Sequence, residues 1–172
     1  KVDAAGGFAY PAMELGLNAA LRSLNSTGVA IVSVGQSHHS GAIGYQIEEL
    51  ARKGAVALAF SNAPSAIAPP GGKIPLFGTN PIAFSCPRAE GDPLLIDLSL
   101  SNVARGKVKL AADRGESIPL GWAVDRDGTP TTNPHKALDG SMTAIGDNKG
   151  AALALMVEIL CAGLSDSNFG FN

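Results

Sequence analysis

The sequence predicts a loop-rich α/β protein, because short apolar runs of strand length alternate with segments of helical periodicity and turn residues separate them. Hydrophobic residues make up 45% of the 172 residues and charged residues 16%, a balance that favours a globular core over disorder. The 21 glycines and 11 prolines indicate many ordered turns. A chain of this length fits one domain, whose core is aliphatic because aromatic residues amount to 5%.

The first third of the chain carries two predicted helices and two predicted strands. Apolar residues at helical spacing predict a helix over Pro11–Asn25, with a stop signal that ends at Gly28. The apolar run 29–34 predicts a strand, and residues 44–53 predict a second helix. Another apolar run, 56–60, predicts a buried strand, since continuous apolar runs suit a sheet that is covered on both faces.

The rest of the chain contains more turns. Residues 94–98 predict a strand, and 101–112 predict a helix with Ser101 as a possible N-cap. Asp-Gly and Asn-Pro pairs predict that 113–140 consists mostly of turns. The final helix is predicted over 151–164 and is apolar nearly all round, so we expect it to be buried.

Charge and cysteine usage limit the classes of partner. The net charge of −2, with scattered lysines and arginines, gives no basic stripe for nucleic acid and no polybasic patch for a membrane. Cys86 and Cys161 lack C-x-x-C spacing, and we expect them to be reduced and inert. No charged and then apolar stretch follows Lys1, so we expect no signal peptide. These features predict a cytoplasmic protein with a small-molecule partner and without nucleic-acid or membrane partners.

The segment Gln36–Ala42 joins a predicted strand to a predicted helix, a place where ligands and anions often bind. His38 and His39 are adjacent, but no further ligand lies at metal-site spacing, so no metal is predicted. A hydrolase built from Ser37, His39 and Asp97 is an alternative, although the chain has no G-x-S-x-G motif. Neither a Rossmann G-x-G-x-x-G nor a P-loop follows a strand.

Several short motifs each predict only a turn when they are considered alone, and they indicate a function only when they are taken together. They resemble the malate/L-lactate dehydrogenase family of oxidoreductases, which is unrelated to the Rossmann-type lactate dehydrogenases. The resemblance runs in register over essentially the whole chain. The motifs that carry it are Ser37–Ala42, Ser61–Ala63, Ala68–Lys73, Phe77–Phe84, Ile96–Ser99, Ala104–Val108 and Lys149–Gly150.

This resemblance implies a non-Rossmann α/β fold, with a sheet flanked by helices, and a reductase that uses NADPH or NADH, usually as a homodimer. The motifs are most similar to the branch that reduces Δ1-pyrroline-2-carboxylate or Δ1-piperideine-2-carboxylate to L-proline or L-pipecolate, as in proline metabolism. A 2-hydroxy acid dehydrogenase of the malate, L-lactate or ureidoglycolate type is the main alternative. A nucleotide-binding module without turnover and a structural domain are further alternatives.

The resemblance also implies site residues, and the chemistry of these residues suits their expected ligands. A helix start suits an anionic pyrophosphate, and a hydroxyl with a guanidinium suits a carboxylate. The residues expected to contact the substrate are Thr79, Arg105 and Gly106. The residues expected to bind the cofactor are His38, His39, Ser40, Gly41, Ala42, Asp97, Leu98, Ser99, Asn148 and Lys149.

Two departures from the family pattern matter. The family's proton-donor histidine lies in a Ser-His-Gly motif of an N-terminal segment, which this chain lacks, so we expect no catalytic residue here. Position 107, where some imine reductases carry an assisting carboxylate, is Lys107. Family members are also longer. We therefore expect residues 1–172 to be the cofactor-binding domain of a longer protein, with residues 150–164 forming a buried helix that leads toward a companion domain.

Overall fold

The computed structural model describes residues 1–163 and 167–171, which divide into two compact units. Neither unit is a continuous stretch of sequence. Unit 1 comprises Lys1–Ser61, Pro81–Leu98 and Leu160–Asn168. Unit 2 comprises Asn62–Asn80, Ser99–Ile159 and Phe169–Asn172.

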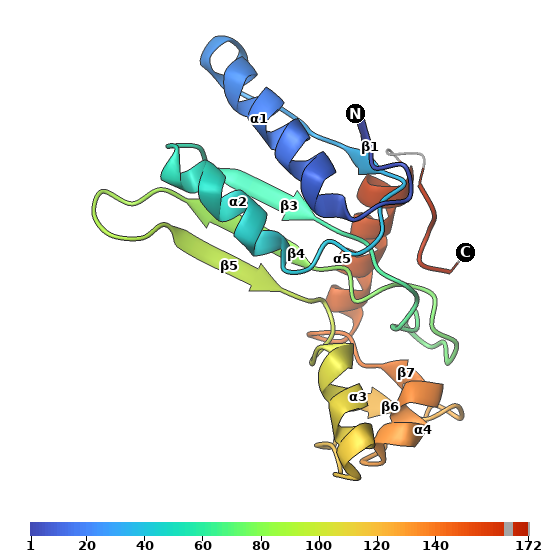
Figure 1. Ribbon diagram of the computed structural model, residues 1–172. Coiled ribbons are helices and arrows are strands. Elements are labelled where there is room, and N and C mark those ends of the chain that lie inside the picture. Colours follow the sequence, from blue (N-terminus) through green and yellow to red (C-terminus); the bar gives the residue numbers. More distant parts are fainter. Residues whose placement is uncertain (164–166, 172) are drawn as a thin grey trace. The chain divides into compact units, whose positions relative to one another are not determined.

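Helices and strands are interspersed along the chain (Figure 1), which confirms the predicted α/β class. The first unit contains β1 (Val2–Asp3), α1 (Ala9–Thr27), β2 (Val34–Gly35), α2 (Ile43–Arg52), β3 (Ala57–Phe60), β4 (Ile82–Cys86) and β5 (Leu94–Leu98). The second contains α3 (Arg105–Arg114), β6 (Ala123–Val124), α4 (Pro134–Asp139), β7 (Ser141–Met142) and α5 (Asn148–Glu158). A π-helical turn, Ile159–Gly163, follows α5.

The central element of unit 1 is an antiparallel sheet in the order β3-β4-β5, and α2 lies across one of its faces (Figure 1). Apolar residues of α2 recur four and then three positions apart, as expected for a helix that buries one stripe. They pack on the small residues of the strands beneath. The resulting core cluster consists of Ile43, Ile47, Leu50, Ala57 and Ala83.

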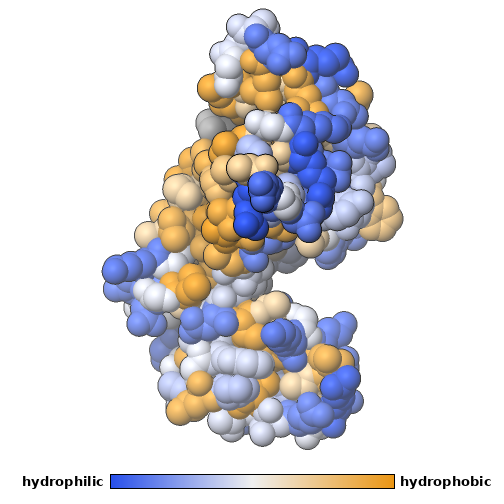
Figure 2. Space-filling model, turned by 90° about the vertical axis from the view of Figure 1, so that its left-hand side faces the viewer, coloured by the Kyte–Doolittle hydropathy of each residue, from blue (hydrophilic) through white to orange (hydrophobic). Residues whose placement is uncertain are grey.

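The opposite face of this sheet is more exposed than predicted. Leu58, Phe84 and Ile96 lie in register on that face, and Leu58 is 62% and Ile96 45% exposed. The expectation that 56–60 is covered on both faces is therefore wrong, because an antiparallel sheet can bury one face under a helix and leave the other open. Hydrophobic side chains gather over a broad area of the visible surface in Figure 2.

Both N-terminal helices are confirmed, with ends that differ from the predicted ones by one or two residues. The strand predicted over 29–34 is wrong except at its end, since β2 comprises Val34 and Gly35. The physical reason is pairing. β2 pairs in parallel with β1, which is two residues long, so the preceding segment has no ladder to join and Ile31 is 91% exposed.

Two predictions in the second half needed correction. The helix predicted from Ser101 begins at Arg105, because the Ser101 hydroxyl donates to the carbonyl of Val103 in a turn and Ala104 occupies the N-cap. The region expected to consist mostly of turns contains α4. There, the Asn133 side chain accepts hydrogen bonds from the first backbone amides of the helix and Pro134 occupies its first position, so the Asn-Pro pair starts a helix.

The final predicted helix is confirmed in part. α5 begins at Asn148, its regular part ends at Glu158, and residue 164 lies outside the described residues. The helix is not buried all round, since Leu155 is 46% exposed. No helix among residues 1–163 and 167–171 is long and apolar enough to cross a membrane.

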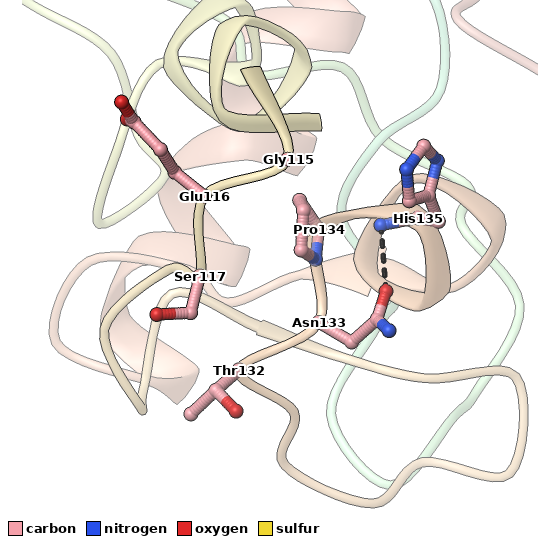
Figure 3. A pocket seen from close by; sticks show the side chains of 7 residues that line it. All are labelled: Gly115, Glu116, Ser117, Thr132, Asn133, Pro134 and His135. Carbon is pink, nitrogen blue, oxygen red and sulfur yellow. Dashed lines mark hydrogen bonds between the residues drawn. The ribbon is translucent and has the colours of Figure 1, made fainter. Parts of the chain in front are cut away.

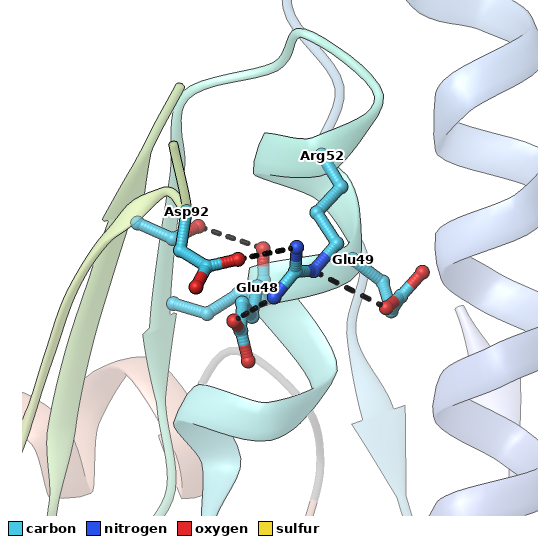
Figure 4. A network of polar contacts seen from close by, with 6 residues as sticks. Glu48, Glu49, Arg52 and Asp92 are labelled. Atoms are coloured by element: carbon cyan, nitrogen blue, oxygen red, sulfur yellow. Dashed lines mark hydrogen bonds and ion pairs between the residues drawn. The ribbon is translucent and has the colours of Figure 1, made fainter. Parts of the chain in front are cut away.

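A surface network joins α2 to the turn between β4 and β5 (Figure 4). The Arg52 guanidinium donates to Asp92 at 2.9 Å and to Glu48 at 2.6 Å, and it lies 3.8 Å from Glu49. The hydrogen bond to Asp92, followed by that to Glu48, raises the pKa of Arg52. Because all four side chains are at least partly exposed, this network adds little to stability.

The left-handed C-cap of α1 gives a test of the fold. Gly28 has φ of 72° and its N–H donates to the carbonyl of Leu24. We expect Gly28→Ala to lower the free energy of unfolding by about 1 kcal/mol, because a Cβ is strained in this conformation. Gly28→Asn should cost less, since asparagine tolerates the left-handed region. Urea unfolding measures both, and equal losses for the two variants would contradict this account.

Candidate functional site

The N-terminal segment fixes the loop Gln36–Ala42. The Gly6 N–H donates to the Gln36 carbonyl at 2.7 Å, and the His38 N–H donates to the Gly7 carbonyl at 2.7 Å. The rings of Phe8 and His38 meet edge to face, with their centroids 5.7 Å apart. The loop is therefore a defined structure, although His38 itself is exposed. Sequence patterns did not indicate that Phe8 supports this loop.

Gly41 is required at its position for two reasons. Its φ of 61° lies in the left-handed region, and a Cβ there would collide with the hydroxyl of Tyr10 in α1. Its N–H donates to Nδ1 of His39 at 2.7 Å, which orients the imidazole. The loop thus comes within contact of α1, and a larger residue at 41 would displace it.

Asp97, at the end of β5, reaches the first turn of α2. Its Oδ2 accepts a hydrogen bond from the Gly44 N–H at 2.8 Å, and a Cβ on Gly44 would lie 2.8 Å from the same oxygen. A carboxylate at a helix N-terminus is stabilised by the helix dipole. The expectation of an anionic pyrophosphate at this helix start changes for α2, because the pyrophosphate would be repelled by the carboxylate of Asp97. Asp97 is better suited to accept hydrogen bonds from ligand hydroxyl or amide groups.

The alternative of a Ser37–His39–Asp97 hydrolase does not fit this geometry. In such a triad the Nδ1–H of the histidine donates to the aspartate. Here Nδ1 of His39 accepts from Gly41, and Asp97 accepts from Gly44.

In unit 2, hydrogen bonds bring three of the predicted segments together. The Leu100 N–H donates to the Thr79 carbonyl at 2.7 Å, and the Ile145 N–H donates to the Leu100 carbonyl at 2.9 Å. The Ser99 hydroxyl lies 3.1 Å from that of Ser101. Thr79, Ser99 and the turn before α5 are therefore neighbours in unit 2.

The start of α5 carries the predicted cofactor residues Asn148 and Lys149, and both are exposed. No side chain caps this helix. The turn before it is tight, because a Cβ on Gly150 would collide with the carbonyl of Ile145. A helix start with a neighbouring lysine is a physically suitable place for a phosphate.

The first turns of α3 carry the predicted substrate residues. Arg105 and Gly106 are exposed, and the Arg105 guanidinium donates to the Leu138 carbonyl at 3.2 Å. Lys107 and Lys109 follow and are also exposed, and the first turn of the helix has no acidic residue. Basic residues at this end oppose the helix dipole, so the arrangement disfavours the helix and favours a bound anion.

The predicted residues divide between the two units. Thr79, Ser99, Arg105, Gly106, Asn148 and Lys149 belong to unit 2. His38, His39, Ser40, Gly41, Ala42, Asp97 and Leu98 belong to unit 1.

Two surface hollows have none of these residues in their lining. One cavity of about 290 Å³ is formed by the turn after α3 and the start of α4 (Figure 3). There the Asn133 side chain caps α4 and accepts from the His135 N–H at 2.9 Å. Another cavity, of about 450 Å³, lies between α1 and residues 29–32. Both follow from the packing of neighbouring elements and contain no predicted site residue.

Sequence patterns missed two buried polar residues of unit 2, Asn80 and Glu158, which are 0% and 1% exposed. Glu158 stands out in the sequence as the one acidic residue of the apolar final helix, and a buried acid needs partners. The two cysteines, in contrast, are half-buried. Within residues 1–163 and 167–171, histidine, cysteine and acidic side chains form no group of three that could hold a metal ion.

The contact between Asp97 and α2 gives a test of the site's architecture. We expect Asp97→Ala to lower the free energy of unfolding by about 1 kcal/mol, as for the loss of a helix cap, and Asp97→Asn to cost less because the amide oxygen still accepts from Gly44. Asp92→Ala is the matched control, since Asp92 lies in the same hairpin but pairs with an exposed arginine. Chemical denaturation compares the three, and an Asp92→Ala loss as large as that of Asp97→Ala would refute the cap.

Comparisons with known proteins cover the whole chain. The family model for malate/L-lactate dehydrogenase matches residues 1–172. The chain is 59% identical over 171 residues to a (2R)-3-sulfolactate dehydrogenase (NADP(+)) of Chromohalobacter salexigens, covering 99% of this chain and 51% of that protein. It is 45% identical over 172 residues to a Δ1-pyrroline-2-carboxylate/Δ1-piperideine-2-carboxylate reductase of Pseudomonas syringae pv. tomato, covering 99% and 50%.

A solved structure agrees with these relatives. The crystal structure of a Δ1-piperideine-2-carboxylate reductase from Pseudomonas syringae superposes with a TM-score of 0.95 at 44% identity, over 99% of this chain and 52% of that one. The chain thus spans about half the length of the relatives it matches. The predicted family resemblance is confirmed, and the chain belongs to the malate/L-lactate dehydrogenase family.

Proposed function

We propose that the protein containing this chain is an NADP(H)-dependent oxidoreductase of small 2-hydroxy acids, reducing the corresponding 2-oxo acids in the reverse direction. The observation that carries this proposal is the 59% identity, over 171 residues, to a relative named as an NADP(+)-dependent dehydrogenase of 3-sulfolactate. When bound, a nicotinamide cofactor supplies or accepts the hydride. The chain's own residues bind and orient the ligands.

The charge of α3 supports a substrate with more than one anionic group. Arg105, Lys107 and Lys109 add three cations to a helix end that is already positive, and no acidic residue offsets them before Asp113. A 2-hydroxy acid with a second anion, such as a sulfonate, is attracted to such a surface. The lysine at position 107 thus fits an acid of this kind better than it fits a cationic imine.

Reduction of a cyclic imino acid is the second candidate, and it is the substrate class to which the sequence motifs are most similar. Its support is the 45% identity to a Δ1-pyrroline-2-carboxylate/Δ1-piperideine-2-carboxylate reductase. Both candidates carry a carboxylate beside the carbon that receives hydride. The same residues, Thr79, Arg105 and Gly106, therefore serve either substrate.

The proposed roles follow the chemistry of each unit. In unit 1, the loop His38–Ala42 and Asp97 bind neutral, hydrogen-bonding parts of the cofactor. In unit 2, Ser99, Asn148 and Lys149 suit a phosphate group. The general acid is expected in another segment of the protein. The homodimer and the cytoplasmic location stay predictions.

A substrate panel separates the candidates. We expect the intact protein to oxidise NADPH fastest with 3-sulfopyruvate, ahead of pyruvate, oxaloacetate, Δ1-pyrroline-2-carboxylate and Δ1-piperideine-2-carboxylate. Lys107→Glu should raise the KM for 3-sulfopyruvate about tenfold, the effect of losing one favourable charge contact of about 1.4 kcal/mol. Arg114→Glu, at the other end of α3, is the matched control. A preference for the cyclic imines would support the second candidate, and binding of NADPH without turnover would indicate a nucleotide-binding module.

The cofactor loop gives a second kinetic test. We expect Gly41→Ala to raise the KM for NADPH at least about tenfold, because the new Cβ collides with the Tyr10 hydroxyl and displaces the loop. Tyr10→Phe removes that hydroxyl. The double variant should therefore recover part of the affinity for NADPH, whereas the strain from the positive φ of residue 41 persists. An unchanged KM in Gly41→Ala would contradict the assignment of this loop to the cofactor.

A further inference from the structure

We propose that Glu158 is a positioning residue for the substrate, because its carboxylate fixes the turn Gly78–Asn80 that carries Thr79. This inference deepens the proposed function and rests on it, since Thr79 is there the residue that faces the substrate carboxylate. Glu158 lies at the end of α5, about eighty positions further along the chain.

The carboxylate of Glu158 is buried and surrounded by donors. Oε1 accepts hydrogen bonds from the Gly78 N–H and from Nδ2 of Asn80, both at 3.0 Å. Oε2 accepts from the Gly170 N–H at 3.1 Å. These partners all donate, as suits an ionised carboxylate, which has no proton of its own to give. Such hydrogen bonds to a charged group are stronger than neutral ones.

Asn80 completes the support on the other side of Thr79. Its Nδ2 also donates to the Ala154 carbonyl at 2.9 Å, and its Oδ1 accepts from the Ala63 N–H at 3.1 Å. The residue is fully buried and has φ of 39°, a conformation that needs such support. The neighbours of Thr79 on both sides are therefore held by the same buried network.

Thr79 itself is left with little backbone freedom. Its carbonyl accepts from the Leu100 N–H at 2.7 Å. Gly78 is also closely confined, since a Cβ there would collide with the Ala63 carbonyl. Thr79 as a whole is half-buried, whereas Gly78 and Asn80 on either side of it are buried. A hydroxyl presented from a backbone fixed in this way can orient a carboxylate closely.

The alternative is that Glu158 serves stability alone. Apolar residues of similar volume often replace buried charges without loss of stability, so stability gives no special reason for an acid here. Fixing the position of a turn, in contrast, does require directional hydrogen bonds. The two explanations differ in what happens to substrate affinity when the network is weakened and the fold is retained.

The test is Glu158→Gln in the intact protein, with the acid that the wild-type protein reduces best in the panel above. The amide keeps the size of the side chain but removes its charge and places an N–H₂ group beside one of the donors. We expect the KM for the acid to rise about tenfold, the effect of weakening one hydrogen bond to a charged group, while the KM for NADPH changes by less than about twofold. Glu158→Ala should act in the same direction and more strongly.

Val157→Ala is the matched control. Val157 is the neighbouring residue of α5 and is fully buried, but it takes no part in the polar network. Its truncation lowers stability through lost packing and leaves the three donors paired. If Val157→Ala raised the KM for the acid as much as Glu158→Gln, the effect would be a general loss of stability and the proposal would be overturned.

Amide hydrogen exchange gives a readout that does not depend on activity. We expect Glu158→Gln to speed amide exchange at Gly78 relative to wild type. Val157→Ala, in contrast, should leave the exchange rate at Gly78 unchanged relative to the rates in α5. A wild-type protein without turnover would refute the proposed function. In that case, unchanged exchange at Gly78 in Glu158→Gln would overturn the role of Glu158 as well. Faster exchange there would still support the role of Glu158 in fixing the turn. With an active wild type, an unchanged acid KM in Glu158→Gln would overturn the positioning role alone.

Discussion

One buried carboxylate in unit 2, that of Glu158, joins segments that are distant in the sequence. Removing the charge of Glu158 from water costs on the order of several kcal/mol unless donors surround it, so the segments that supply those donors must converge on it. They come from Gly78, Asn80 and Gly170, on both sides of α5 in the sequence. The same requirement explains the glycine at 170, where a Cβ would lie 2.8 Å from Oε1 of Glu158.

Unit 1 also contains an acidic side chain that accepts a hydrogen bond from a backbone amide, in this case at the surface. Asp97 accepts from the Gly44 N–H and so ties the end of β5 to the start of α2, beside the loop that ends at Ala42. In each unit, an acidic side chain fixes a backbone amide close to residues that the family resemblance assigns to ligands. The difference is burial, since Asp97 is exposed and Glu158 is not. Asp97 can therefore also meet a ligand, whereas Glu158 acts only through the turn it holds.

The sequence predicted features that depend on local chemistry and missed those that depend on distant partners. α1 and α2 follow from apolar periodicity and from the glycine stop at 28, so their bounds were close. The strand predicted over 29–34 failed because pairing with β1 decides where it ends. Motifs also indicated Thr79 and Lys149 through the family resemblance. The partners of Glu158 lie too far along the chain for any periodicity to connect them.

The proposed site residues of the two units differ in charge. Unit 1 contributes an acid, Asp97, with backbone amides and imidazoles, which suit the hydroxyl and amide groups of a dinucleotide. Unit 2 contributes the cations Arg105, Lys107 and Lys149 at two helix starts, which suit its phosphates and an acid substrate. The side chains that suit anions are therefore the exposed cations at the starts of α3 and α5.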